Sequence, residues 1–230
     1  MTVYFVGAGI GGVDYLTVKA FKIISEAEVI IYDALVDTQI LDLTSPQCIK
    51  ICVGKRGGKI STSQETINEL LVTYTQQYDK VIRLKSGDCG VFGRINPELK
   101  ALQIINADIE IIPGISSALA VPLLANIMLT EKNDSRCVTI VTGHDPDSLN
   151  WSILSQVDTL VILMGAKNLS IIIEKLQLYG RSPDFPIVII KDGGTNQQQV
   201  WKGRLDNILK KTLNISLSPC IIVISKVVNN

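Results

Sequence analysis

Apolar and polar positions alternate along this chain as short strands separated by helices. Val3 to Val6 is an apolar run that ends on glycines, and apolar residues then recur at helical spacing from Leu16 to Ile24. Compact runs rich in β-branched residues predict more strands, and a longer periodic segment predicts a helix; the strands are 28–33, 48–53, 80–84 and 108–112, and the helix is 62–76. This alternation predicts a parallel or mostly parallel sheet.

The second half of the chain also alternates strands and helices, beyond a turn at Pro113-Gly114. The expected strands are 136–141, 159–164, 187–191 and 218–224, and the expected helices are 168–179 and about 205–210. The expected fold class is therefore α/β, with two α/β domains at residues 1–113 and 114–230. A cleft between two such domains is the default position for an active site.

Residues 111–130 carry no charge over a length that could span a bilayer. Pro113, Gly114, Pro122 and Asn126 interrupt this segment, and neither an aromatic belt nor a basic flank accompanies it. We therefore expect a turn followed by a core helix and no membrane span. The start of the chain lacks a basic region and reads as a buried strand, which argues against a signal peptide.

Charge and cysteine content exclude several classes of function. The chain has 22 basic and 22 acidic residues, so no global field attracts nucleic acid or an anionic membrane. Its five cysteines contain no C-x-x-C pair, which argues against a disulfide framework and a structural zinc site and favours a reducing cytoplasm. The single histidine, His144, has no partners at metal-ligand spacing, so no metal site is expected.

A glycine cluster after the first strand supports one enzymatic hypothesis. Gly7, Gly9 and Gly12 satisfy G-x-G-x-x-G, and Asp33 follows the next strand, where a ribose-binding acid would lie. This pattern is typical of NAD(P)- or FAD-dependent oxidoreductases. However, Asp14 would lie at the entrance to the following helix, a poor place for a doubly charged pyrophosphate. Asp33 is therefore interpreted as a ribose-binding or a catalytic acid.

Two further loops contain charged residues among glycines. Residues 53–59 contain three positive charges, which suit a polyanion or simply a solvated loop. Residues 83–94 form a second glycine-rich turn after a strand and end on Arg94. Cys89 within this turn has no activating base nearby in the sequence, and His144 is more typical of a structural or exposed residue than of a general base.

Taken in order, these segments resemble the tetrapyrrole methylase family over nearly the whole chain. The matching segments of the first half are residues 6–11, 14–17, 32–36, 53–56, 64–68, 83–88 and 91–94. Those of the second half are residues 113–118, 141–144, 164–165, 194–195 and 219–223. Each segment is weak evidence by itself, but this many in one order are specific.

The resemblance is greatest to the members that act on uroporphyrinogen III. It implies transfer of methyl groups from S-adenosylmethionine to ring carbons, giving precorrin-2 and S-adenosylhomocysteine for sirohaem or cobalamin biosynthesis, by a homodimer. The family pattern implies catalytic roles for Asp33 and Lys55. It implies cofactor contacts at Ile10, Ser86, Gly87, Asp88, Val91, Ser116, Ser117, Met164 and Gly194. The substrate carries eight carboxylates, for which the basic partners would be Arg56, Lys59 and Arg94.

The chain departs from the family pattern in four segments. They are Ile10-Gly11-Gly12, Ser86 to Gly90, Ile95 to Glu98 and Leu129 to Lys132. Loss of prolines and of a phenylalanine would loosen the cofactor loops. Three alternatives therefore stay open: a methylase of a later precorrin, an NAD(P)-dependent oxidoreductase, and a paralogue that binds tetrapyrroles without turnover.

Overall fold

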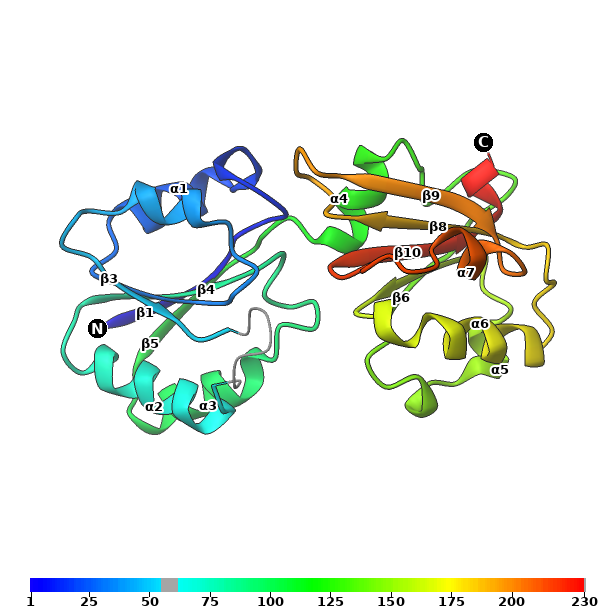
Figure 1. Ribbon diagram of the computed structural model, residues 1–230. Coiled ribbons are helices and arrows are strands. Elements are labelled where there is room, and N and C mark those ends of the chain that lie inside the picture. Colours follow the sequence, from blue (N-terminus) through cyan, green and yellow to red (C-terminus); the bar gives the residue numbers. More distant parts are fainter. Residues whose placement is uncertain (55–61, 230) are drawn as a thin grey trace. The chain divides into compact units, whose positions relative to one another are not determined.

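A computed structural model describes residues 1–54 and 62–229 of the chain (Figure 1). The chain divides into two compact units, unit 1 at Met1–Ser116 and unit 2 at Ser117–Asn230. The division lies three residues after the boundary expected at residue 113. Both units are α/β, so the expected fold class is confirmed.

Unit 1 is built on a five-stranded sheet in which every neighbouring pair is parallel. Its strands are β1 (Thr2–Gly7), β2 (Val29–Tyr32), β3 (Ile49–Cys52), β4 (Lys80–Lys85) and β5 (Asp108–Ile112). The spatial order is β3-β2-β4-β1-β5, which places β4 between β2 and β1. All five strands point the same way, so the turns that follow them share one edge of the sheet. The parallel sheet predicted for this half is confirmed.

Helices cover both faces of the unit 1 sheet (Figure 1). They are the α-helices α1 (Val18–Ser25), α2 (Gln64–Thr75) and α3 (Ile95–Ile104) and the 3-10 helices η1 (Val13–Tyr15) and η2 (Thr38–Leu43). The chain alternates along β1, so Val6 packs with α1 and η2 on one face while Phe5 packs with α2 and α3 on the other. Thr17 caps α1 through Ala20 N, and Ser63 caps α2 in the same manner.

Unit 2 contains a second five-stranded sheet, of mixed direction. Its strands are β6 (Val138–Thr142), β7 (Thr159–Leu163), β8 (Pro186–Lys191), β9 (Gln199–Arg204) and β10 (Cys220–Ser225). The order is β6-β7-β10-β8-β9, and only β6 and β7 pair in parallel. Because β10 is antiparallel to both β7 and β8, the strands β6, β7 and β8 end at the same edge.

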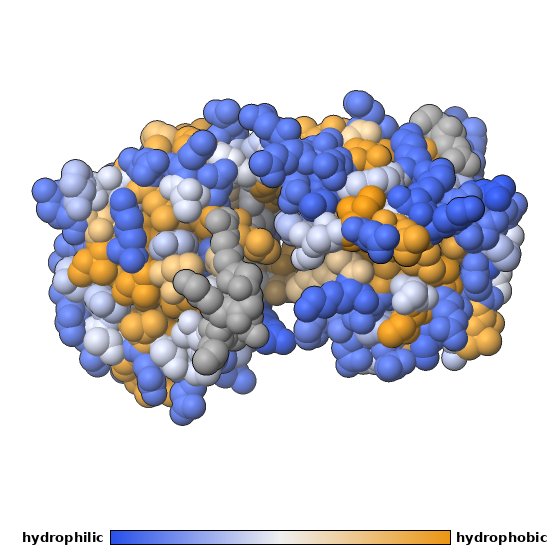
Figure 2. All heavy atoms as spheres, in the orientation of Figure 1, coloured by the Kyte–Doolittle hydropathy of each residue, from blue (hydrophilic) through white to orange (hydrophobic). Residues whose placement is uncertain are grey.

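The core of unit 2 lies mainly on one face of its sheet. Its helices are α4 (Ser117–Leu124), α5 (Trp151–Leu154), α6 (Leu169–Leu178) and α7 (Ile208–Lys211), with 3-10 helices η3 (Pro146–Ser148), η4 (Ala166–Asn168) and η5 (Lys226–Asn229). Side chains of α5, α6 and α7 pack with β7, β8 and β10 in one apolar cluster. Figure 2 shows hydrophilic side chains over much of the visible surface of unit 2, with apolar ones between them.

Among the elements that the sequence pattern did not predict are helix α3 and strand β9. Helix α3 begins with Ile95-Asn-Pro97, which reads as a turn, but a proline in the first helical turn loses no hydrogen bond. Strand β9 is an edge strand whose side chains are largely exposed, so it lacks the apolar run of the other strands. Segment 111–130 holds a strand end, a turn and the short helix α4, and among the described residues no helix has the length and apolarity needed to cross a membrane.

Candidate active site

Three turns converge at the edge of the unit 1 sheet where its strands end. Gly7 ends β1, Ser86 follows β4, and Pro113 follows β5. The first two turns are joined by a short antiparallel bridge, in which Gly9 N donates to Gly87 O at 3.1 Å and Gly87 N donates to Gly9 O at 2.8 Å. Both glycines have positive φ, which a side chain would strain.

The third turn packs directly on the other two through glycine backbones. A Cβ placed on Gly114 would lie 2.2 Å from Gly87 O and 2.6 Å from Gly7 Cα. A Cβ on Gly7 would lie 2.5 Å from Gly114 Cα. All three contacts are with backbone atoms, so only glycine permits this approach. The three turns therefore form one rigid unit, and the departures from the family pattern at residues 10–12 and 86–90 leave it closed.

Asp88 fastens two of these turns with its carboxylate. Its Oδ1 accepts from Gly90 N at 2.8 Å within its own turn, and its Oδ2 accepts from Gly114 N at 2.9 Å in the turn after β5. Hydrogen bonds from backbone N–H groups to an ionised carboxylate are among the stronger ones in proteins. Asp88 therefore shapes the loops in addition to any contact with a ligand.

Asp33 lies at the same edge, beside the turn after β4. Its backbone N donates to Leu84 O at 3.1 Å, which continues the pairing of β2 with β4 beyond Tyr32. Its carboxylate Oδ1 accepts from Arg83 Nη2 at 2.5 Å. The Asp33 side chain is 31% exposed whereas that of Arg83 is 2% exposed. An accessible acid is thus held by a buried cation.

Arg83 belongs to a buried group of charges that extends to helix α3. Its Nε donates to Glu98 Oε2 at 3.0 Å, and Lys85 Nζ donates to Glu98 Oε1 at 2.8 Å. Burial lowers the pKa of the Arg83 guanidinium, but the carboxylates of Asp33 and Glu98 outweigh that effect and the pKa is raised. The two buried cations are balanced by the buried Glu98 and the partly exposed Asp33, so the group as a whole is neutral.

The buried charges are the functional feature that sequence reasoning overlooked. Arg83 and Lys85 lie two residues apart in a central strand, so both side chains point to the same covered face. Two like charges on one buried face require acidic partners. That spacing was a usable signal, but the partner Glu98 lies in helix α3, which the sequence pattern did not predict.

The surroundings of the glycine cluster differ from those of a dinucleotide site. Gly12 leads into the 3-10 helix η1, and α1 begins only at Val18, so the α-helix that would bind a pyrophosphate does not follow the cluster directly. The strand beside β1 is β4 instead of β2, so Asp33 is one strand farther away than a ribose-binding acid would be. The arrangement disfavours the oxidoreductase hypothesis.

Two of the other predicted cofactor residues follow strands of unit 2. Met164 follows β7 with φ of 57° and is exposed, and Gly194 follows β8 with φ of 84°. Exposed apolar side chains on strained backbone are typical of functional positions. Ser117 begins α4, whereas Ser116 is the last residue of unit 1. Asn168 Nδ2 donates to Gly143 O at 2.8 Å and so fixes the turn after β6.

The remaining predicted residues fall into two groups. Ile10 and Val91 are half-buried within the turns of unit 1, and Arg94 is exposed at the start of α3 with φ of 51°. The predicted catalytic residue Lys55 and the predicted substrate residues Arg56 and Lys59 lie outside the described part of the chain.

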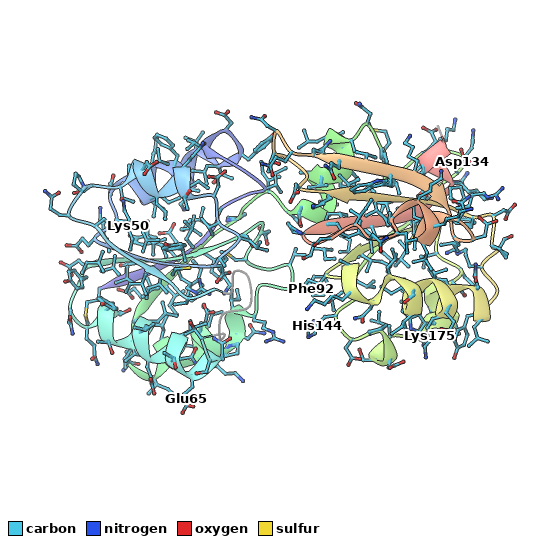
Figure 3. All side chains as sticks on the ribbon, viewed as in Figure 1. Lys50, Glu65, Phe92, Asp134, His144 and Lys175 are labelled. Atoms are coloured by element: carbon cyan, nitrogen blue, oxygen red, sulfur yellow. The ribbon has the colours of Figure 1, made fainter. Side chains whose placement is uncertain are left out.

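Neither Cys89 nor His144 has the surroundings of a catalytic residue within its own unit. Burial raises the pKa of the Cys89 thiol to about 12, so the thiolate is not populated at neutral pH. Phe92 and His144 lie in the turns that follow β4 and β6 respectively, in different units (Figure 3). His144 is exposed, and its backbone N donates to Thr142 Oγ1 at 3.2 Å. Its backbone contacts fit a structural turn.

Comparison with known proteins gives consistent results. Residues 2–209 match the family model of tetrapyrrole (corrin/porphyrin) methylases. The chain is 50% identical over 226 residues to a uroporphyrinogen-III C-methyltransferase of Synechococcus elongatus, covering 98% of this chain and 93% of the relative. It is 41% identical over 234 residues to the enzyme of that name from Methanocaldococcus jannaschii, covering 99% and 96%.

A solved structure agrees with these sequence relatives. The crystal structure of uroporphyrin-III C-methyl transferase from Thermus thermophilus, complexed with S-adenyl homocysteine, superimposes with a TM-score of 0.86. The two chains are 31% identical, and the match covers 100% of this chain and 99% of that one. Family model, sequence relatives and fold thus agree, and the chain belongs to the tetrapyrrole (corrin/porphyrin) methylases.

Proposed function

We propose that this protein is an S-adenosylmethionine-dependent C-methyltransferase that converts uroporphyrinogen III to precorrin-2, in sirohaem or cobalamin biosynthesis. The observation that carries the proposal is the adjacency of Asp33 and the glycine turns at one sheet edge of unit 1. A partly exposed acid beside rigid, glycine-lined turns suits alignment of a carbon nucleophile with a methyl donor, followed by proton removal.

The charges of the turns support a cationic ligand. Residues 7–12, 86–90 and 113–116 include no lysine or arginine, and they include Asp88. Lys85, the nearest lysine in the chain, is buried and paired with Glu98. A diphosphate would lack cationic partners at these turns, whereas a sulfonium requires none. The donor set therefore fits S-adenosylmethionine better than NAD(P).

In the mechanism, this chain supplies position and a base. When bound, S-adenosylmethionine supplies an electrophilic methyl group. Ile10, Ser86, Gly87, Asp88 and Val91 are the proposed contacts in unit 1. Ser116, at its end, and the unit 2 residues Ser117, Met164 and Gly194 complete the proposed set. Asp33 accepts the proton that leaves the ring once the new carbon bond has formed, and Arg83 holds its carboxylate in place.

Cationic side chains are the proposed contacts for the substrate carboxylates. Arg94 is exposed and is the N-cap residue of α3, the helix whose Glu98 holds Arg83. Among the described residues, Arg94 has no ion pair or side-chain hydrogen bond, so its five donors are available. Arg56 and Lys59 are proposed for the same role, and Lys55 as a second catalytic residue. A homodimer in the cytoplasm completes the proposal.

Calorimetric titration of the purified protein with S-adenosylhomocysteine, and separately with NAD and NADP, tests the cofactor. We expect S-adenosylhomocysteine to bind with a Kd in the micromolar range, about −8 kcal/mol, and neither dinucleotide to bind. Tight binding of NAD or NADP would contradict the proposal.

A methylation assay tests the substrate. Purified protein with S-adenosylmethionine should methylate uroporphyrinogen III, with precorrin-2 followed by absorbance. Turnover only of a later precorrin would reassign the substrate and keep the methyltransferase. Binding of the tetrapyrrole without turnover would instead identify a paralogue that has lost the activity.

A further inference from the structure

The carboxylate of Asp33 is held on one side only. Oδ1 accepts from Arg83 Nη2, and within the described part of the chain no other group hydrogen-bonds this carboxylate. The side chain is 31% exposed, so part of it can be reached from outside the protein, and Oδ2 is the oxygen that Arg83 leaves without a hydrogen bond. The direction in which Asp33 presents its free oxygen therefore depends on Arg83.

The guanidinium of Arg83 is itself fully fixed. Nη1 donates to Ile31 O and to Leu84 O, both at 3.3 Å, so it joins the backbones of β2 and β4. Nε donates to Glu98 Oε2 at 3.0 Å, and Nη2 donates to Glu98 Oε1 at 3.3 Å as well as to Asp33. Arginine has five N–H donors, and here each has an acceptor. The group has no freedom to rotate without losing several bonds.

Glu98 is the part of this arrangement that the sheet cannot supply. It is 1% exposed and lies in the first turns of α3. Lys85 Nζ also donates to it at 2.8 Å, and Gln64 Nε2 approaches at 3.5 Å. This buried carboxylate holds the Nε and Nη2 groups of Arg83, and Nη2 is the nitrogen that also donates to Asp33.

We propose that Arg83, locked by Glu98, is a positioning residue that sets the orientation of the Asp33 carboxylate for proton removal. This inference rests on the proposed function, because it assumes that Asp33 is the base. Lysine cannot replace Arg83, since an ammonium is a point charge that cannot contact Asp33, Glu98 and two carbonyls in one plane. The role is distinct from that of a residue that touches the substrate.

A double-mutant cycle on kcat tests the proposal. Arg83→Lys keeps the charge and removes the planar fork, and it should lower kcat on the order of tenfold to a hundredfold, the loss typical of a missing orienting partner. In an Asp33→Asn background the same substitution should change kcat by no more than about twofold, since its target is gone. The affinity for S-adenosylhomocysteine should be unchanged throughout. Losses that multiply, or a loss of cofactor affinity, would show that Arg83 acts independently of Asp33.

Lys80→Gln is the matched control. Lys80 lies in the same strand, β4, and pairs with Glu26 at the exposed surface. The substitution Lys80→Gln therefore removes a paired cation from the strand without affecting Asp33. The variant should keep the wild-type kcat. A loss equal to that of Arg83→Lys would mean that altering any cationic side chain of β4 lowers activity, which would overturn the proposal.

Asp33→Glu tests the proposal if Arg83→Lys does not fold. Position 33 is partly exposed, so the longer side chain should not prevent folding. It retains the charge but moves the carboxylate by one methylene. We expect a kcat loss on the order of tenfold or more, and full activity would mean that the placement of the carboxylate is unimportant.

A crystal structure of the folded variant gives a result that does not depend on activity. The Asp33 side chain of Arg83→Lys should change its orientation relative to the wild type, and an unchanged orientation would overturn the positioning role. If the wild-type enzyme does not methylate uroporphyrinogen III, the proposed function fails by that assay, whereas the inference about Arg83 is still decided by the structure.

Discussion

Asp33 combines two properties that seldom occur together in one side chain. Its carboxylate is accessible, and yet it is bound to an arginine that is almost completely buried. Exposed ion pairs are usually worth little, because both side chains are mobile and solvated. Here one partner is immobile, so the geometry of Asp33 is set by the fold. This is the arrangement expected of a proton acceptor whose position matters.

Replacement of Asp33 by asparagine should separate chemistry from cofactor binding. A general base contributes typically a factor of about 10² to 10⁴, so Asp33→Asn should lower kcat by an amount in that range. The Kd for S-adenosylhomocysteine should be nearly unchanged. Asp42→Asn, which alters an exposed carboxylate of the same unit, is the control and should leave kcat at the wild-type value. Equal losses of turnover and cofactor affinity for Asp33→Asn would contradict its role.

Arg94 should affect the tetrapyrrole and not the cofactor. Arg94→Ala removes an exposed cation, and we expect the KM for uroporphyrinogen III to rise about tenfold, the worth of one charge-assisted hydrogen bond. Lys100→Ala, at an exposed position of the same helix α3, is the control. If Arg94→Ala instead weakens S-adenosylhomocysteine binding alone, the carboxylate role is wrong.

The cysteines should react according to their burial. Burial raises the pKa of Cys89 to about 12, while Cys52 and Cys137 are exposed. Iodoacetamide at pH 8 should therefore alkylate Cys52 and Cys137 in the folded protein and Cys89 only after unfolding, as read by mass spectrometry of peptides. Rapid labelling of Cys89 in the native protein would show that its turn opens.

The raised pKa of Cys89 also has a consequence for stability. Its ordinary value is 9.0, so the unfolded chain loses this proton first as pH rises. The contribution of the buried neutral thiol is therefore complete below about pH 9 and declines as pH increases toward 12. Cys89→Ser should reduce this decline in denaturant titrations at alkaline pH.

Single residues of the candidate site were predictable where they lie at or just beyond the end of a predicted strand. Asp33 and Asp88 were identified from their places at strand ends and from the family resemblance, and the structure brings both to one sheet edge with the glycine turns. Arg83 was visible only as a charged strand residue, because its partners lie 50 and 15 residues away in the chain. Pairing over such separations depends on the packed fold.

Among the elements, the glycine turns are more constrained than the strands they follow. Gly114 approaches Gly87 O so closely that an added Cβ would lie 2.2 Å from it. Asp88 then fastens the same turn through Gly114 N at 2.9 Å. The glycines of this edge are therefore required for packing between turns, and a dinucleotide would not be needed to explain them.

Gly114→Ala tests the packing of the turns. The new methyl group must displace backbone, and we expect the free energy of unfolding to fall by about 1–3 kcal/mol, as in overpacked cores, with weaker S-adenosylhomocysteine binding. In Gly12→Ala the added Cβ would meet the side-chain ends of Gln39 and Asp37, at 3.2 and 3.9 Å, and no backbone atom within 4 Å. That control should show a much smaller change in urea denaturation. Equal effects of both substitutions would contradict the packing argument.

Most strands and long helices were predicted because their apolar periodicity is local. Helix α3 and strand β9 were not, since Asn96-Pro97 imitates a turn and an edge strand needs no apolar run. Because helix α3 was not predicted, the buried charges beside Asp33 were not predicted either. Without that helix, nothing in the sequence pattern brings Glu98 to Arg83.

At the scale of the whole molecule, each unit has its own core. In unit 1, two apolar clusters lie on opposite faces of a parallel sheet, and one large cluster supports unit 2. Units of this size with separate cores meet the usual criteria for a domain. The family resemblance extends across both.

Residues 1–116 should fold as an isolated fragment. All five strands of its sheet and both covering layers are included, so urea denaturation followed by circular dichroism should be cooperative. A fragment ending at residue 104 lacks the edge strand β5, exposes β1 and removes Gly114 from the turns. It should show no cooperative transition. Cooperative unfolding of the shorter fragment would mean that β5 is dispensable for unit 1.

The sequence by itself determined the α/β class, the approximate positions of most strands, the division near residue 113 and the family, because these follow from local periodicity and from motifs read in order. Only the tertiary structure decided the strand order β3-β2-β4-β1-β5, the mixed direction of the unit 2 sheet and the contact of Gly7, Gly87 and Gly114. It also decided that Asp33 is held by Arg83 and Glu98. These features join residues far apart in the chain, and the energy that selects them comes from burial, close packing and charge neutralisation, which no local pattern records.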